Sequence, residues 1–479
     1  MSLKKQALSG VFWSFLQLFS TQVIGFIVSI ILARLLLPAE FGLIAMLGIF
    51  ISLGNTLINS GLTQSLIRTK EIDDQDFSTV FFFNLIGSII IYGVVFITAP
   101  IIASFYNQEL LTSIIRIYSI TFIINAFSSI QTTRLNKKMD FKTQLKVSIP
   151  SLIIGSTVGI SMALNNFGVW SLVWSAIIQS LAATIQMWYW TKWKPIWAFN
   201  WNKFNYHFHY GVKLMFSGIL DTVFRNAYSV IIGKFFAPAQ VGFFNRADSL
   251  QMLPAGTIST IITKVSFPLF ASIQNDDERL KSIFKRIMQM VIFLVTPTLI
   301  LMGVLAEPLF RFLFTEKWLP AVPYFQILCI NGILYPIHGY NLQILNVKGR
   351  SDLFLKLEII KKILLVVVIL ISFQFGIFGL LFGSVTTSLI CFFINAYYSG
   401  KFINYTAWQQ IKDILPIILL SILIGLIVYY FDGLLLTISE NDFVRLLAGS
   451  IIGLILYTIA AFLFKMNSLF ELITIIKGK

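Results

Sequence analysis

The sequence has little charge and almost no cysteine for its length. Only 12% of its 479 residues are charged and 57% are hydrophobic, whereas a soluble domain is about 25% charged and about 45–50% apolar. With a mean hydropathy of +0.82, the chain cannot cover a soluble globule with polar side chains, which excludes a soluble enzyme as the default class. Cys329 and Cys391 lie in apolar runs, which favours buried thiols over a disulfide framework or a metal site.

Long apolar runs, in contrast, are abundant. A transmembrane helix needs about 20 mostly apolar residues, and the sequence predicts an all-α integral membrane protein with about fourteen such helices. The first apolar run continues to Leu37 without a cleavage site, so it is interpreted as an uncleaved span. The predicted spans lie near 11–35, 41–66, 79–104, 111–132, 147–165, 168–189, 214–236, 240–270, 287–306, 320–346, 359–376, 377–398, 414–432 and 443–464.

Acidic residues are scarcer than basic ones, 21 against 36, which gives a net charge of +15. In a soluble protein this excess would suggest a nucleic-acid partner, but in a membrane protein Lys and Arg collect in cytoplasmic segments. Placing the N-terminus inside puts most of them there, so we expect both termini in the cytoplasm and no nucleic-acid partner. The tryptophans between Trp188 and Trp201 predict an interfacial elbow over residues 191–213.

Two stretches of the sequence are similar at an offset of 200 residues. Residues 29–42 read SIILARLLLPAEFG and residues 229–242 read SVIIGKFFAPAQVG, with a shared P-A-x-x-G turn and a cation four residues before each proline. The offset spans an even number of helices, so the two copies are expected to be parallel. We therefore predict an N-terminal six-helix bundle over 1–190, a second bundle over 214–398, and two additional helices with a cytoplasmic tail over 399–479.

Polar residues inside the predicted spans mark a candidate site, because a charged residue at the bilayer centre costs about 2.5–3.5 kcal/mol. One face of the span near 214–236 carries Ser217, Asp221, Arg225 and Tyr228. Asp221 and Arg225 can neutralise each other as an i,i+4 pair, so a purely structural ion pair is the alternative. The offset of 200 aligns Gln17 with Ser217 and Thr21 with Asp221, which predicts two matching polar faces across a wet cleft.

Other polar groups fall into a smaller set of candidates. Arg116 lies near one end of its span, and the span near 240–270 adds Asn245, Arg246 and Asp248.

The sequence has no P-loop, and Asp74-Gln75-Asp76 is interpreted as a solvated acidic turn rather than as a catalytic D-x-D. The three histidines, which are interpreted as structural, are His207, His209 and His338. No cofactor or metal site is expected.

Three segments resemble a known family. They are residues 34–78, RLLLPAEFGLIAMLGIFISLGNTLINSGLTQSLIRTKEIDDQDFST; residues 131–142, QTTRLNKKMDFK; and residues 245–279, NRADSLQMLPAGTISTIITKVSFPLFASIQNDDER. Over roughly residues 5–400 the chain resembles the polysaccharide-transporter branch of the multidrug/oligosaccharidyl-lipid/polysaccharide exporter superfamily, which includes Wzx-type flippases for lipopolysaccharide, capsule or exopolysaccharide repeat units. The resemblance implies a V-shaped pair of six-helix bundles and no enzymatic activity.

The resemblance also implies a substrate. It is an undecaprenyl-diphosphate-linked oligosaccharide, moved across the bacterial inner membrane by alternating access, with a polysaccharide polymerase and a chain-length regulator as partners. Cations suit the diphosphate, and the residues expected to bind it are Arg225 and Arg34, then Lys234, Arg246 and Arg116. Gln17, Thr21, Ser217, Tyr228 and Asn245 are expected to bind sugar hydroxyls. Asp221 and Asp248 are the candidates for ion coupling.

Several other functions stay open at this point. A multidrug or small-molecule antiporter on the same scaffold is disfavoured by an interior richer in Arg and Lys than in carboxylates. A teichoic or teichuronic acid exporter and a peptidoglycan-precursor flippase are mechanistically close to the favoured reading. A membrane-embedded polymerase or glycosyltransferase is disfavoured by the short outer loops, and a purely structural scaffold leaves the paired polar faces unexplained.

Overall fold

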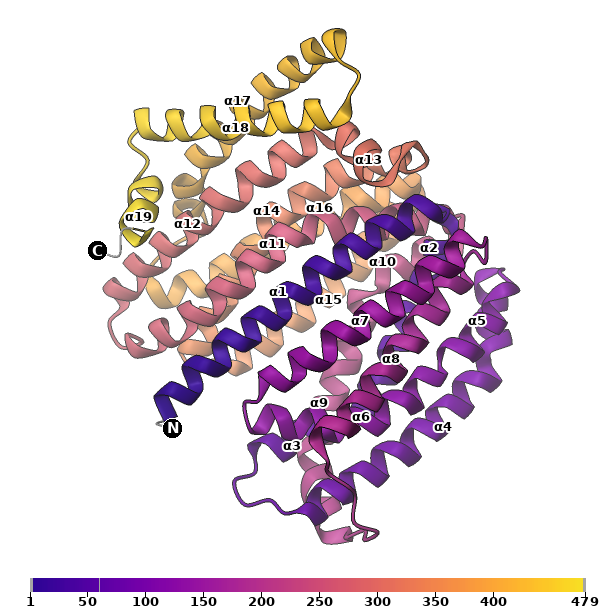
Figure 1. The fold of residues 1–479 in the computed structure, drawn as a ribbon. Coiled ribbons are helices and arrows are strands. Elements are labelled where there is room, and N and C mark those ends of the chain that lie inside the picture. Colours follow the sequence, from indigo (N-terminus) through magenta and orange to yellow (C-terminus); the bar gives the residue numbers. More distant parts are fainter. Residues whose placement is uncertain (1–2, 60, 477–479) are drawn as a thin grey trace. The chain divides into compact units, whose positions relative to one another are not determined.

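The structure is a computed structural model that describes residues 3–59 and 61–476. Over these ranges it is helical throughout and contains no strand (Figure 1), so the predicted all-α fold is confirmed. The ends of the chain, whose placement in the cytoplasm the sequence predicts, lie at residues outside the described ranges. The chain divides into two compact units, Met1–Gly242 and Phe243–Lys479, and the predicted domain limits stay a prediction.

The first unit contains ten complete helices and the start of an eleventh among its described residues. Proline opens α2 and α11, where its missing N–H costs nothing. The helices are α1 (Leu3–Leu35), α2 (Pro38–Asn59), α3 (Leu62–Arg68), α4 (Asp74–Tyr106), α5 (Leu110–Tyr118), α6 (Ile120–Lys137), α7 (Phe141–Leu164), α8 (Trp170–Thr191), α9 (Trp201–Arg225), α10 (Ala227–Phe235) and α11 (Pro238–Ser272), which continues into the second unit.

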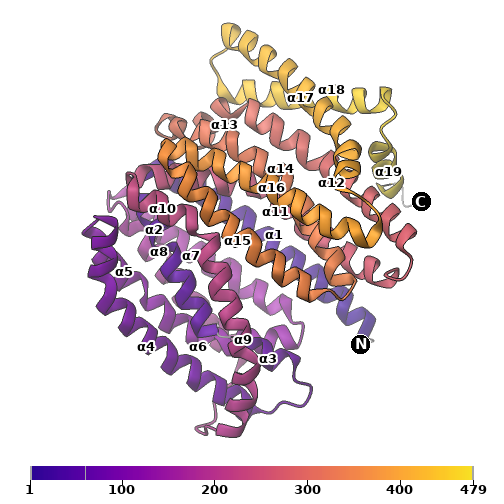
Figure 2. The same ribbon diagram turned by 180° about the vertical axis from the view of Figure 1, so that it is seen from behind.

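The second unit holds the rest of α11 and the remaining helices. Among them α14 packs against α16 and α12, and α17 packs against both α12 and α18 (Figure 2). These helices are α12 (Asp277–Val304), α13 (Ala306–Phe314), α14 (Val322–Val347), α15 (Ser351–Ser372), α16 (Gly376–Ile403), α17 (Ala407–Ile438), α18 (Asp442–Leu463) and α19 (Asn467–Ile476), with short 3₁₀ turns η1 (Glu316–Ala321) and η2 (Phe373–Phe375).

The two similar sequence segments fold alike. One helix ends at Leu35 and the next begins at Pro38, and the same break recurs 200 residues later between Phe235 and Pro238. Within the first unit the two turns meet closely: a Cβ on Gly42 would lie 1.8 Å from the Pro238 carbonyl oxygen, and one on Gly242 would lie 2.1 Å from that of Pro38. The shared glycine therefore permits a reciprocal backbone approach that no larger residue allows.

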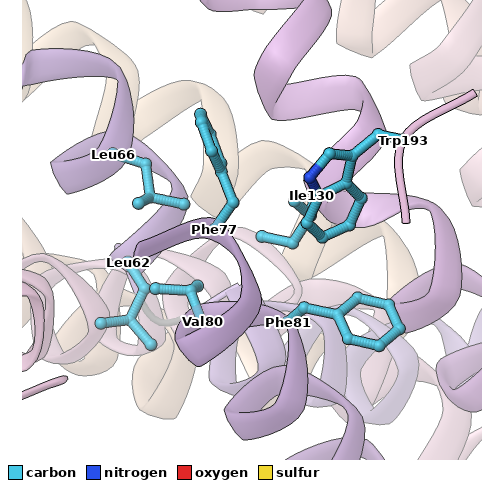
Figure 3. Close-up of a cluster of buried hydrophobic side chains, with 7 residues drawn as sticks. All are labelled: Leu62, Leu66, Phe77, Val80, Phe81, Ile130 and Trp193. Carbon is cyan, nitrogen blue, oxygen red and sulfur yellow. The ribbon is translucent and has the colours of Figure 1, made fainter. Parts of the chain in front are cut away.

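An aromatic core holds the segment after α8 against α4. The indole of Trp193 is buried in a cluster with side chains of α3, α4 and α6 (Figure 3); the members are Leu62, Leu66, Phe77, Val80, Phe81, Ile130 and Trp193. Two α4 hydroxyls also accept backbone N–H groups of this segment: Ser78 from Ile196 at 2.9 Å and Thr79 from Asn200 at 3.2 Å. The start of α9 is thus fixed on the start of α4.

Ten stretches of the described chain are long and apolar enough to cross a membrane, which makes the protein a multi-pass membrane protein. They are Phe12–Leu35, Pro38–Ile58, Asp74–Tyr106, Leu110–Lys137, Phe141–Leu164, Asp277–Val304, Glu316–Val347, Ser351–Ile403, Ala407–Ile438 and Asp442–Leu463. The predicted number of about fourteen spans and the V-shaped arrangement stay predictions.

The structure differs from the expected spans in three places. The helices α8, α9 and α11 lie outside the ten stretches, because tryptophan, glutamine and charged side chains lower their hydropathy. The helix that contains the start of the span expected over 214–236 begins earlier, at Trp201, and the helical run is interrupted at Asn226. The two spans expected over 359–376 and 377–398 share one long apolar stretch that η2 divides, and α15 already begins at Ser351.

Candidate functional site

The helix α9 carries the central candidate residues, and a local side-chain cap explains where it begins. The Asn200 side chain caps its start by accepting the N–H groups of Asn202 at 3.0 Å and Lys203 at 3.2 Å. Its packed face is made of small residues: the Thr222 hydroxyl lies 3.3 Å from that of Thr56 on α2. This tight contact with α2 leaves the neighbouring face of α9 exposed.

The exposed face of α9 presents the ion pair predicted from the sequence. Arg225 donates from Nη2 to Asp221 Oδ2 at 2.8 Å, and the two side chains are 77% and 57% exposed. The pair lies in the last turn of α9, directly before the interruption at Asn226. Because exposed charges are costly in hydrocarbon, we expect this face to meet water.

Two other predicted cations of the first unit are held by α4. Arg116 donates from Nε to the Phe96 carbonyl at 3.2 Å, and its guanidinium lies 4.4 Å from the centre of that ring. Lys234 donates to the Phe105 carbonyl at 2.5 Å, with its ammonium 4.8 Å from the Phe105 ring centre. Since the two carbonyls are nine residues apart on α4, the structure does not bring these two cations together.

The predicted polar residues of α1 are held by helices of the first unit. Gln17 donates from Nε2 to the Ser148 hydroxyl on α7 at 3.2 Å, and Thr21 donates to the Gln17 carbonyl at 2.8 Å. Arg34, in the last turn of α1, is exposed. On the other candidate helices, Ser217 is exposed and Tyr228 is half-buried. Gln17 and Thr21 therefore bind protein groups, while Arg34 and Ser217 present polar atoms outward.

The predicted residues of the second unit lie at the start of α11. The Arg246 guanidinium lies 4.9 Å from the ring centre of Phe314 and 5.1 Å from that of Trp318, so aromatic faces stabilise its charge. Asp248 accepts a hydrogen bond from Gln251 Nε2 at 3.1 Å. Asn245 is half-buried.

A buried polar network joins α3, α4 and α9, and it corrects the interpretation of residues 74–76 as a solvated turn. Asp76 is buried, and its carboxylate oxygens lie 3.2 Å from His207 Nε2 and 3.0 Å from Lys203 Nζ. On the other side of the imidazole ring, His207 Nδ1 lies 2.8 Å from the Ser65 hydroxyl. The order Ser65–His207–Asp76 is that of a hydrolase triad, but all three groups are buried and no substrate reaches them. The network fastens α9 to α3 and α4.

The charged rim of this network explains the pKa values of its members. Asp73 caps α4 in a capping box with Asp76. A hydrogen bond from Lys203 holds the pKa of Asp73 well below its ordinary value. Burial lowers the pKa of His207, against an opposing hydrogen bond to Asp76, so His207 is neutral at pH 7.

A second network lies inside the second unit, between the helices that contain the spans expected over 320–346 and 377–398. His338 on α14 contacts the Ser388 hydroxyl of α16 at 2.9 Å and Asn395 Nδ2 at 3.4 Å. Nearby on α15, Lys361 forms an ion pair with Glu358. One exposed stripe of α15 is apolar, with Leu355, Ile359, Ile363, Val367 and Leu370, and its helical spacing begins before the span expected over 359–376.

Groups of three or more His, Cys, Asp or Glu side chains able to hold a metal ion are absent from residues 3–59 and 61–476. The candidate site therefore offers an exposed ion pair, hydroxyls and aromatic rings. Such groups bind anions and sugars without covalent chemistry.

Comparison with known proteins places these features in context. The model of a family described as polysaccharide biosynthesis protein matches residues 31–323. The lipopolysaccharide biosynthesis protein WzxC of Escherichia coli K12 is 24% identical over 86% of this chain and 84% of its own. The teichuronic acid biosynthesis protein TuaB of Bacillus subtilis 168 is 25% identical over 74% of this chain and 73% of its own.

Among solved structures, the lipid II flippase MurJ in an inward-closed conformation has a similar fold. The TM-score is 0.76, and the match covers 95% of this chain and 99% of MurJ at 14% sequence identity. At that identity the match shows the fold and not the substrate.

Proposed function

Because the chain belongs to the polysaccharide biosynthesis protein family, we propose that it moves a polyprenyl-diphosphate-linked oligosaccharide across the bacterial inner membrane for the synthesis of a surface polysaccharide. The family resemblance expected from the sequence is confirmed, and the chain is a membrane transporter and not an enzyme. The transported molecule, and the residues that bind it, are the proposal.

The observation that carries the proposal is the exposed pair of Asp221 and Arg225 in the last turn of α9. A diphosphate carries negative charge that hydrocarbon does not solvate, and a guanidinium binds phosphate oxygens through two parallel hydrogen bonds. Asp221 keeps the empty site electrically balanced, and the incoming phosphate takes over its place beside Arg225. The polyprenyl tail stays in lipid throughout.

The proposed transport cycle is alternating access between two bundles. In this proposal the helices form two six-helix bundles in a V with two additional C-terminal helices, and both termini lie in the cytoplasm. Arg34, Arg116, Lys234 and Arg246 supply further positive charge along the path. Asp248 is the second carboxylate proposed for ion coupling.

The similarity to TuaB favours a second candidate, a lipid-linked precursor of teichuronic acid. The two candidates share the anionic phosphate link and differ in the sugars, so they use the same cations. Loss of one polymer and not the other in cells lacking the protein separates them.

The test is Arg225→Ala in the host cell, with surface polysaccharide and membrane protein level measured together. One charge-assisted hydrogen bond contributes about 1.5–3 kcal/mol, so the variant is expected to lower polymer at least about tenfold. Arg225→Lys keeps the charge and retains part of the activity. Lys192→Ala, an exposed cation after α8, is the matched control and leaves polymer unchanged. Normal polymer in Arg225→Ala at normal protein level removes Arg225 from the site.

A further inference from the structure

The polar face of α9 continues well beyond the residues expected from the sequence. Going along the helix at spacings of four, three, four, four and four residues, one face carries Tyr206, Tyr210, Lys213, Ser217, Asp221 and Arg225. From Tyr206 to Arg225 this stripe extends about 28 Å, close to the thickness of a hydrocarbon layer of about 30 Å. It is named the α9 stripe below.

The α9 stripe is not a packing surface. Tyr206 is 63% exposed, Lys213 and Ser217 are exposed, and Tyr210 is half-buried. The approach to the residue before α3 uses the next face, where a Cβ on Gly61 would lie 2.7 Å from the carbonyl oxygen of Gly211. Apart from Tyr210, which lies against Arg68 of α3, the side chains of the stripe are exposed.

The end of the stripe far from Arg225 holds a second pair of cations. Arg68 is the last residue of α3 and is exposed, and its guanidinium lies 4.8 Å from the centre of the Tyr210 ring. Lys213 follows Tyr210 by one turn. Within the part of the chain that the structure describes, neither Arg68 nor Lys213 forms a salt bridge.

Three of the four carboxylates close to this place in the sequence have cationic partners: Asp73 and Asp76 bind Lys203, and Asp74 binds Arg134. The fourth, Glu71, is exposed. Among the described residues the positive charges of Arg68 and Lys213 are therefore not neutralised by a salt bridge. An exposed arginine stacked on a tyrosine, one turn from a free lysine, is suited to a phosphate group that carries a sugar, because the cations bind phosphate oxygens and the aromatic rings bind sugar faces.

We propose that Arg68 and Lys213, with Tyr210 and Tyr206, form a loading subsite that binds the glycosyl diphosphate headgroup before it reaches Arg225. This inference rests on the proposed function and adds a second, separate binding position to it. Lys213 precedes Arg225 by twelve residues, about 18 Å along the helix, so a single diphosphate does not contact both cations at once. The headgroup passes from one position to the other along Ser217.

The test measures binding of farnesyl diphosphate, a short polyprenyl diphosphate, to the full-length protein in phosphatidylcholine nanodiscs by isothermal titration calorimetry. Arg68→Gln combined with Lys213→Gln is expected to weaken binding at least about tenfold, since two charge-assisted contacts are lost. Lys70→Gln, an exposed lysine two residues after Arg68, is the matched control and changes binding less than about twofold. Arg68→Lys combined with Lys213→Arg keeps the charges and retains most of the affinity, which excludes misfolding as the cause.

Phosphatidylglycerol distinguishes a specific site from a general anionic surface. If phosphatidylglycerol does not displace farnesyl diphosphate from the wild-type protein, the subsite recognises the diphosphate. The inference is overturned if phosphatidylglycerol competes as well as farnesyl diphosphate itself, or if the doubly substituted protein binds farnesyl diphosphate as tightly as the wild type. Normal surface polysaccharide in Arg225→Ala cells removes Arg225 from the proposed site and leaves the subsite inference standing, because the nanodisc measurement does not depend on it.

Discussion

The buried ion pair of Asp432 and Arg445 leads to an asymmetric prediction about stability. Arg445 donates from Nε to Asp432 Oδ1 at 2.9 Å and from Nη2 to Oδ2 at 2.6 Å, joining α18 to α17. Only 4% of the Arg445 side chain and 11% of the Asp432 side chain are exposed. Substituting one partner leaves a buried charge, whereas substituting both leaves none.

The magnitudes follow from the surroundings of the pair. Breaking a buried pair on one side costs about 3–5 kcal/mol. Asp442 lies 3.4 Å from Arg445 Nη1 and offers partial compensation, so Asp432→Asn is expected to cost about 3 kcal/mol, at the lower end of that range. Asp432→Leu combined with Arg445→Met is expected to cost less than about 1 kcal/mol, because Asp442 keeps its contact with Arg311 at 3.4 Å.

The assay is equilibrium unfolding in mixed micelles, followed by tryptophan fluorescence, on the wild type, the two variants and one control. The control is Glu471→Gln, which removes an ion pair with Arg286, a side chain that is 60% exposed; it is expected to change the free energy of unfolding by less than about 1 kcal/mol. A cost below about 1 kcal/mol for Asp432→Asn, or a double variant no more stable than the single one, refutes the reasoning.

Two more predictions concern the first unit. Burial lowers the pKa of His207 from 6.5, so below about pH 6.5 the unfolded chain binds a proton that the folded chain does not, and the free energy of unfolding falls. His207→Gln should reduce this loss of stability, which is measured as unfolding midpoints from pH 7.5 to 5. An unchanged dependence of the midpoint on pH contradicts the prediction. Gly155→Ala puts a Cβ 2.5 Å from Gln179 Cβ and should cost about 1–3 kcal/mol in the same assay, whereas Gly87→Ala, with open space around it, should not.

Features set by local sequence were predictable. The helix breaks before Pro38 and Pro238 follow from the fixed backbone angle and missing N–H of proline. The pairing of Asp221 with Arg225 follows from helical spacing alone. In both cases the interacting groups are close in sequence, so no knowledge of neighbouring helices was needed.

Features set by distant partners were not predictable. Asp76 is buried against His207, which is 131 residues away, and a short acidic sequence contains no sign of that partner. Glu358 and Lys361 lie at the start of the span expected over 359–376, and they neutralise each other within α15, which already begins at Ser351. Half of the residues of the α9 stripe lay in a segment interpreted as an interfacial elbow, because its tryptophans outweighed the regular spacing of Tyr206, Tyr210 and Lys213.

The spacing of charges along α9 also bears on turnover. A carrier with one very strong anion site would hold its cargo and release it slowly, since conduction requires sites weak enough to leave. In the proposed cycle, two cationic positions about 18 Å apart along α9 bind the headgroup in turn, and Asp221 weakens binding at Arg225 because it competes for the same guanidinium. Weaker binding at each position shortens the time for which a headgroup stays there, so the proposed arrangement favours fast turnover over high affinity.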